Sequence, residues 1–448
     1  MTGFARLMCF LWAFALFYVS FVPGYYVRIG SVSPVISLLF KYIPFLTLCL
    51  IYLVVLYRFI SNRSSGNLRG KLSRTIEDRL ELYVALYVTS CTISVLNAPI
   101  DRTLEDFARL IYYSATGIFI LSSIRALDLA HRADLTVFLS RLIPIFGGIL
   151  ALYGTFSYLS GSDWVFHKDY GYNTIFYNGV FWQSNTVRAY STFGNPIPYA
   201  TFLMMTFPFG WFNFTIAKGF AWKSVWLFVS LLIIIGIFFS YSRGAYIALL
   251  MGVVLLLLKW RVSLYTKCSV AISVVVFLCI SYGAINENSI SHIERFQHRV
   301  EQLKNINETE SERIYRYNMT YELLQTYPYT GVGFGNLVDN FEKFISKVDY
   351  GIARTTDNLY LMILCETGML GMVCFMLLIS QILLAFLKKP SRDVTTFSYC
   401  CLVAVAMALV NAMTWDNLNH VAIRVLFWLI VALGLEDKKK DKKNEQEL

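Results

Sequence analysis

Runs of apolar residues long enough to cross a membrane recur along the whole of this 448-residue chain, and they constrain its fold most. About 20 apolar residues in a helix span the hydrocarbon core of a bilayer. The runs are continuous and do not alternate at every second residue, which argues against a transmembrane β-barrel. Only 15% of the residues are charged, against about 25% in soluble domains. The sequence therefore predicts an all-α polytopic membrane protein, with residues 1–448 forming a single integral membrane domain.

Twelve transmembrane helices are predicted from these runs. They lie at about 4–23, 32–57, 81–97, 107–124, 136–158, 196–214, 224–241, 243–259, 268–286, 358–386, 394–412 and 421–435. The first run lacks a small-residue cleavage site, so we expect a retained helix and not a signal peptide.

Basic residues gather in alternate connections between the spans and so predict the orientation. The basic segments are 58–80, 125–135, 215–223, 259–267, 388–392 and the charged tail 436–448. An excess of Lys and Arg marks the cytoplasmic side, so both termini are expected in the cytoplasm. Because the basic residues cluster in short segments between the apolar runs, the formal charge of +10 does not indicate a nucleic-acid partner, and none is predicted.

The nine cysteines lie in or beside the apolar runs, without a CxxC or Cys/His cluster. Neither a disulfide framework nor a structural zinc site is therefore predicted. The outer loops contain no D-x-D or His-rich cluster either. We expect no metal site and no cofactor.

Two long loops, about 159–195 and 287–357, are expected on the outer side. The second precedes the tenth span and contains "TESERIYRYNMTYELLQTY", which opens with Thr309 and Glu312 in capping-box spacing. It ends in the Pro/Gly-rich "YPYTGVGFGN", which cannot continue a helix. The pattern predicts a large extracytoplasmic helical loop with one amphipathic helix, which could lie against the membrane.

Four arginines lie on the outer side, where the positive-inside rule disfavours them: Arg188, Arg243, Arg313 and Arg316. A guanidinium binds phosphate oxygens bidentately and keeps its charge. If these arginines converge, they suit a lipid-linked diphosphate. The alternative for each is a side chain that reaches the lipid headgroups on its own.

Acidic residues open and interrupt the tenth span. Asp357 stands where a helix N-cap is expected, which does not exclude a catalytic role, and Glu366 is expected to make a polar contact with a neighbouring helix. Gly368 and Gly371 would let another backbone approach closely. His420, in the outer turn "TWDNLNH", is either a second base or an interfacial histidine.

Three stretches together resemble the O-antigen ligase/polymerase superfamily of bacterial membrane glycosyltransferases. They are "RAYSTFGNPIPYATFL", "YSRGAYIAL" and "RIYRYNMTYELLQTYPYTGVGFGNL…DNLYLMILCETGMLG". In the last, Asn358 is followed by nine residues and then Gly368 and Gly371, which is the spacing of the family's final motif. Asp357 stands where ligases of the family carry a histidine, which favours the polymerase branch.

The resemblance implies a multi-pass enzyme of the bacterial inner membrane that uses a glycan donor linked to undecaprenyl diphosphate. The acceptor would be a second lipid-linked repeat unit, and a single displacement would invert the anomeric centre. Arg188 and Arg243 would contact the diphosphate, and Asp357 would be the general base. The predicted substrate-binding residues are Arg313, Arg316, Tyr317, Asn358 and His420.

Two other functions remain open at this point. A ligase would transfer the glycan to lipid A–core, and a lipid-oligosaccharide flippase would carry it across the bilayer. A flippase should show repeat symmetry and charged residues near the midplane, and the sequence shows no repeat. The expected partners are lipid-linked oligosaccharides, membrane lipids and a polysaccharide chain-length regulator.

Overall fold

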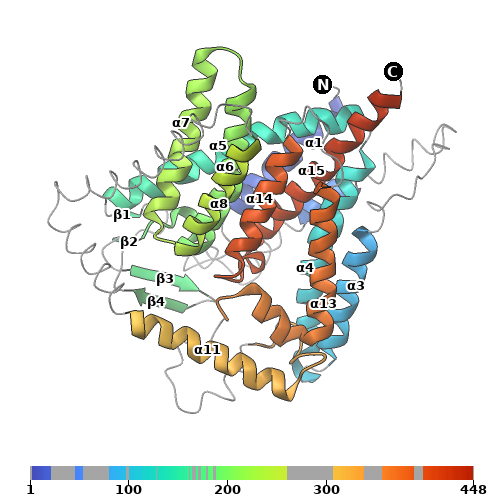
Figure 1. The fold of residues 1–448 in the computed structure, drawn as a ribbon, viewed down its shortest axis with the longest axis vertical. Helices are drawn as coiled ribbons and strands as arrows, with labels where there is room; N and C mark the ends of the chain where they lie inside the picture. Colours follow the sequence, from blue (N-terminus) through green and yellow to red (C-terminus); the bar gives the residue numbers. More distant parts are fainter. Residues whose placement is uncertain are drawn as a thin grey trace.

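The structure is a computed structural model. It describes residues 3–21, 46–53, 80–96, 100–127, 129–160, 162–163, 168–169, 173–177, 180–184, 188–259, 306–337, 356–387 and 397–446. Most of these residues are helical, as Figure 1 shows. The longer helices are α1 (Gly3–Phe21), α3 (Leu80–Val95), α4 (Ile100–Ala126), α5 (Leu129–Ser160), α6 (Pro196–Ile216), α7 (Phe220–Phe239), α8 (Arg243–Lys259), α11 (Ile306–Thr326), α13 (Leu359–Leu387), α14 (Phe397–Asn411) and α15 (Val421–Gln446).

The predicted spans coincide with helices wherever the structure describes them fully. The span at 268–286 lies outside the described residues, and of 32–57 only residues 46–53 are described, as helix. Four described helices are long and apolar enough to cross a membrane: Gly3–Phe21, His131–Ser160, Phe220–Phe239 and Leu359–Leu387. Shorter apolar helices occupy Leu82–Val95, Phe397–Asn411 and Val421–Leu435. A helical protein with candidate membrane spans is confirmed for the described residues, and the number of twelve crossings stays a prediction.

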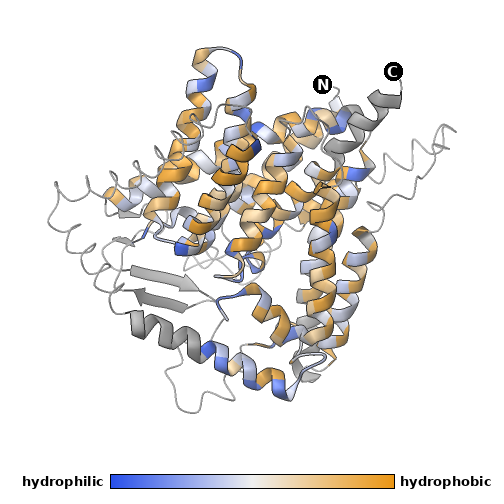
Figure 2. Ribbon diagram, in the orientation of Figure 1, coloured by the Kyte–Doolittle hydropathy of each residue, from blue (hydrophilic) through white to orange (hydrophobic). Residues whose placement is uncertain are grey.

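The bundle is built around α6, which packs against α5, α7 and α14. Most of α6 is buried, including Tyr199, Phe202 and Phe209. Helix α15 packs between α14 and α4, and α13 packs mainly against α3. Apolar residues dominate these helices, whereas the described part of α11 is more polar (Figure 2). Helix α15 continues to Gln446, so the charged tail extends this helix.

Two short antiparallel hairpins lie in the loop between α5 and α6. Strands β1 (Ser162–Asp163) and β2 (Lys168–Asp169) form one, and β3 (Asn173–Tyr177) and β4 (Val180–Ser184) form the other. The predicted all-α fold is confirmed for the bundle, and these hairpins add to it. Asn178 and Gly179 separate β3 from β4, and Asn-Gly between such segments is a strong hairpin signal.

Both chain ends lie at one end of the bundle, and β3, β4 and α11 lie at the other (Figure 1). An even number of crossings requires that the termini share a side; the side that faces the cytoplasm stays a prediction. The helix predicted in the second outer loop is confirmed as α11. It begins at Ile306, before Thr309, so the prediction of a capping box that opens at Thr309 is wrong.

Candidate functional site

The segment that carries Arg188 is held against the end of α7. The backbone N–H of Ala189 donates to the carbonyl of Phe239 at 2.9 Å. The 3₁₀ turn η3 (Ser191–Phe193) follows, and Asn195 then caps α6 by accepting the N–H of Ile197 at 2.9 Å. Within the described residues, the Nε of Arg188 is buried and has no hydrogen-bond partner. Buried donors of this kind are rare; the predicted contact of Arg188 with a diphosphate stays a prediction.

Arg243 is the first residue of α8 and is exposed. A cation at a helix N-terminus opposes the helix dipole, so this position does not stabilise α8. The free N–H groups of a helix N-terminus attract anions, and Arg243 adds a full positive charge there. Since Phe239 is four residues earlier, the Ala189–Phe239 hydrogen bond brings the Arg188 and Arg243 segments to the same end of the bundle.

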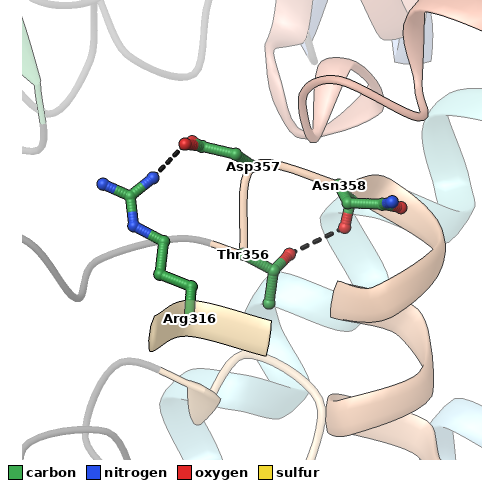
Figure 3. A network of polar contacts seen from close by, with 4 residues as sticks. All are labelled: Arg316, Thr356, Asp357 and Asn358. Atoms are coloured by element: carbon green, nitrogen blue, oxygen red, sulfur yellow. Dashed lines mark hydrogen bonds and ion pairs between the residues drawn. The ribbon is translucent and has the colours of Figure 1, made fainter. Parts of the chain in front are cut away.

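Arg316 and Asp357 form an ion pair between α11 and the start of α13 (Figure 3). The side chains are 12% and 21% exposed respectively. The prediction that both residues belong to one site is consistent with this contact. The Asp357 carboxylate is therefore engaged by a guanidinium.

Asn358, and not Asp357, caps helix α13. The Oδ1 of Asn358 accepts the N–H groups of Tyr360 at 2.9 Å and Leu361 at 3.2 Å. Thr356 donates its hydroxyl to the carbonyl of Asn358 at 2.7 Å (Figure 3). The predicted cap at Asp357 is therefore wrong by one residue, because the amide side chain takes the orphan N–H groups. The Asp357 carboxylate is left to face α11.

Helix α13 is interrupted at Gly368, where φ is 65° and ψ is −168°. Around this break the carbonyls of Cys365 and Glu366 accept hydrogen bonds from outside the helix. The N–H of Val332 donates to Cys365 at 2.9 Å. The N–H of Gly333 donates to Glu366 at 3.1 Å. The turn formed by residues 327–333, which follows α11, is therefore joined to α13 through its backbone.

The bonds on the other side of the break run in the opposite sense. The N–H of Met369 donates to the carbonyl of Pro328 at 2.9 Å, and that of Leu370 donates to Tyr329 at 3.1 Å. A Cβ at Gly368 would overlap the backbone of Tyr329. The expected close backbone approach is confirmed at Gly368. A Cβ at Gly371 would instead meet the side chain of Thr367 in the same helix.

The connection between α14 and α15, residues 412–420, touches all three segments that carry candidate residues. The ring of His420 lies 5.4 Å from that of Phe193, in the Arg188 segment. Thr414 packs against Gly244, where a Cβ would overlap its side chain. The N–H of Leu359 donates to the carbonyl of Ala412 at 2.9 Å. Residues far apart in the sequence are thereby joined at one end of the bundle.

Each of these segments contains one residue other than glycine whose backbone lies in the left-handed region. Among the described residues, those other than glycine with a positive φ are Ser191 at 50°, Tyr241 at 51° and Asp357 at 51°. Such conformations cost energy in L-residues and cluster at functional sites. Ser191 lies close in sequence to Arg188, and Tyr241 lies close to Arg243. Asp357 is itself the predicted base.

His420 is half-buried between the aromatic ring of Phe193 and the start of α15. Burial, and then the positive charge of Arg424, lowers the pKa of His420 to about 3. An effective base has a pKa near the operating pH. The ring contact with Phe193, together with this low pKa, favours a packing role for His420 over that of a second base.

Arg424 is a buried residue that the sequence reading did not single out. Its Cζ lies 3.6 Å from the ring centroid of Tyr113, and its Nη1 donates to the carbonyl of Leu418 at 3.1 Å. Its position inside an apolar span is the sequence feature that could have identified Arg424 as a candidate. Its bonds fix the shape of the α14–α15 connection.

A cavity of about 90 Å³ lies between α3, α4, α13 and α15. Its lining is mainly apolar, with Glu366 and Arg424 among the polar residues. The backbone carbonyl of Glu366 accepts the hydroxyl of Ser94 from α3. The expected polar contact of its carboxylate stays a prediction. In the described part of the chain, no group of three or more His, Cys, Asp or Glu side chains could hold a metal ion.

Two predicted residues remain to be placed. Arg313 lies on α11, one turn before Arg316, and its side chain lies outside the described part. Tyr317 is exposed on the same helix, 40% accessible. Neither is shown to contact the other predicted residues.

Fold and site together define a helical membrane protein in which arginine-bearing polar segments meet at one end of the bundle. Comparison with protein families matches residues 228–376 to a family described as O-antigen ligase. The match includes Arg243, Arg316, Asp357 and the break at Gly368, and it leaves out Arg188 and His420. It supports the resemblance to the O-antigen ligase/polymerase superfamily of membrane glycosyltransferases over less than half of the chain, without distinguishing polymerase from ligase. No curated protein matches the chain.

Proposed function

We propose that this protein transfers a glycan from a polyprenyl diphosphate carrier to a sugar hydroxyl, at the outer face of the bacterial inner membrane. The observation that carries the proposal is the convergence of three segments on the α14–α15 connection. Two of them, with Arg243 and with the Arg316–Asp357 pair, lie within the residues matched to the O-antigen ligase family. Undecaprenyl diphosphate is the carrier that the resemblance implies.

The arginines supply the electrostatic part of the mechanism. As the bond between the anomeric carbon and the diphosphate oxygen breaks, negative charge builds on that oxygen. The Arg188 guanidinium, whose Nε is buried, and Arg243 at the N-terminus of α8 would stabilise this charge. Donors that are already oriented lower the barrier because they bind the transition state more tightly than the ground state.

The Arg316–Asp357 ion pair suggests how the base is controlled. A diphosphate arriving at the site competes for the Arg316 guanidinium and frees the Asp357 carboxylate. The acceptor hydroxyl oxygen then attacks the anomeric carbon, its proton passes to Asp357, and polyprenyl diphosphate leaves. Attack opposite the leaving group inverts the anomeric centre. Asn358 holds the end of α13 in place during this step.

The acceptor decides between two forms of this activity. Asp357 at the position of the ligase histidine favours a polymerase, which adds the chain to another lipid-linked repeat unit. The family description favours the second candidate, a ligase that uses lipid A–core. A chain-length regulator remains a proposed partner of the polymerase form, and membrane lipids would surround either form.

Deleting the gene in its host and separating the lipopolysaccharide on a gel tests both candidates. Core that carries a single repeat unit establishes the polymerase, whereas bare core with accumulated lipid-linked polymer establishes the ligase. Unchanged lipopolysaccharide and unchanged capsule or exopolysaccharide contradict both.

Complementation with Asp357→Asn tests the base, since proton transfer of this kind contributes about 10²–10⁴-fold. We expect a loss of that size in purified enzyme, with partial activity in Asp357→Glu. Full activity of Asp357→Asn would refute the assignment.

A further inference from the structure

Helix α11 and the turn after it expose four tyrosines. Tyr317 and Tyr321 lie one helical turn apart, and Tyr327 and Tyr329 follow in the turn. Their exposed fractions are 40%, 63%, 42% and 76% in this order. We call these four residues the tyrosine face.

The composition around the tyrosine face argues against a bilayer as its partner. The exposed residues from Tyr317 to Tyr329 include Asn318, Glu322 and Gln325, but no Lys, Arg, Leu, Ile, Val or Met. A helix that lies on a membrane presents basic residues on one side and large apolar residues on the other. The face therefore does not fit the amphipathic membrane-surface helix considered from the sequence.

The same composition fits a sugar chain. The ring of a pyranose has an apolar side of C–H groups, which stacks on an aromatic face, and hydroxyls at its edge. Tyrosine offers a large, rigid ring with a polar tip. Amide and carboxylate groups such as those of Gln325 and Glu322 can donate to or accept from sugar hydroxyls.

The tyrosine face is held on a rigid support. Met319, Thr320 and Leu323 are buried on the opposite side of α11. The N–H of Tyr327 donates to the carbonyl of Leu323 at 2.9 Å, which continues the helical bonding into the turn. The carbonyl of Tyr329 accepts the N–H of Leu370 from α13. Little ordering is therefore needed when a ligand binds, which favours affinity.

Tyr317 is the next residue of α11 after Arg316, the partner of Asp357, so the face begins within one helical turn of the candidate catalytic residues along this helix. We propose that the tyrosine face binds the sugar chain of the glycan substrate and guides it to the Arg316–Asp357 pair. This inference rests on the proposed glycan transfer and names a subsite for it.

The test uses full-length protein in lipid nanodiscs and an oligosaccharide released by mild acid from the host's own surface polysaccharide. Titration calorimetry measures its dissociation constant for the native protein, Tyr321→Ala, and Tyr317→Ala with Tyr321→Ala. Loss of one stacked ring should weaken binding about three- to tenfold, and loss of two should weaken it further. Tyr321→Phe keeps the ring and should bind like the native protein. Trp222→Ala, which removes a 63% exposed ring at the far end of α7, is the matched control.

Absence of binding by the native protein, or equal binding by the double variant, overturns the proposal. Strong quenching of Tyr321→Trp by brominated lipids, above the native background, would also overturn it by placing the face in the bilayer. Transfer from a lipid-linked donor is measured on the same preparations. Tyrosine-dependent binding without transfer would support the subsite and contradict the proposed function. Transfer with an unchanged KM in the double variant would support the proposed function and contradict the subsite.

Discussion

Replacing Gly368 by alanine tests the backbone junction between α13 and the 327–333 turn. At φ 65° and ψ −168° the residue occupies a region that is essentially restricted to glycine. Forcing alanine into it costs about 1–3 kcal/mol, and the added Cβ overlaps the backbone of Tyr329. If α13 straightens instead, it recovers two helical hydrogen bonds but loses the four to the turn, at a net 0.5–1.5 kcal/mol each as an order of magnitude. Both routes lead to a loss of about 1–3 kcal/mol in the free energy of unfolding.

The assay is thermal unfolding of the purified full-length protein in one detergent, followed by tryptophan fluorescence. Gly3→Ala is the control for a glycine-to-alanine change, since a Cβ there meets nothing within 4 Å. A melting temperature for Gly368→Ala equal to that of the native protein or of Gly3→Ala would refute the argument.

Two further predictions follow from the capping and packing of the site. Asn358→Ala removes the acceptor for two N–H groups of α13 and should cost about 1 kcal/mol in unfolding free energy; Asn358→Asp, which keeps an acceptor, should cost less, and equal melting of Asn358→Ala and the native protein would contradict the cap. The folded pKa of His420, about 3, lies below its usual value of 6.5, so its contribution to stability is complete above pH 6.5 and is lost as the pH falls toward 3. Between pH 7 and pH 5 the native protein should lose at most about 2 kcal/mol through this group, and His420→Asn should lose less over the same range; identical pH profiles would show that His420 does not titrate in this way.

The bundle could be predicted from the sequence because apolar runs have the length that a bilayer demands. The helix α11 was also readable, since aromatic and apolar residues recur at its helical period and Pro328 ends it. The hairpin of β3 and β4 could be predicted from Asn178 and Gly179. The charged and aromatic residues of the 159–195 loop show no periodicity strong enough to predict strands.

The candidate site was only partly readable. The arginines stood out because the predicted topology places them on the side of the membrane where basic residues are disfavoured. The pairing of Arg316 with Asp357 and the cap at Asn358 depend on the backbone angles of Asp357 and Asn358. The side chains of neighbouring residues do not determine those angles. The junction at Gly368 joins segments more than 30 residues apart through backbone groups, which carry no residue identity. In the sequence, only the glycines marked it.

The contacts of the α14–α15 connection set an order in which the site can be completed during synthesis. Residues 412–420 leave the ribosome after the segments of Arg188, Arg243 and Asp357, and they make contacts with all three. Until the hairpin of α14 and α15 has entered the membrane, those segments lack their common support. A chain stalled before this hairpin would therefore carry every arginine of the candidate site without the contacts that bring them together, and catalytic competence would arrive late in membrane insertion.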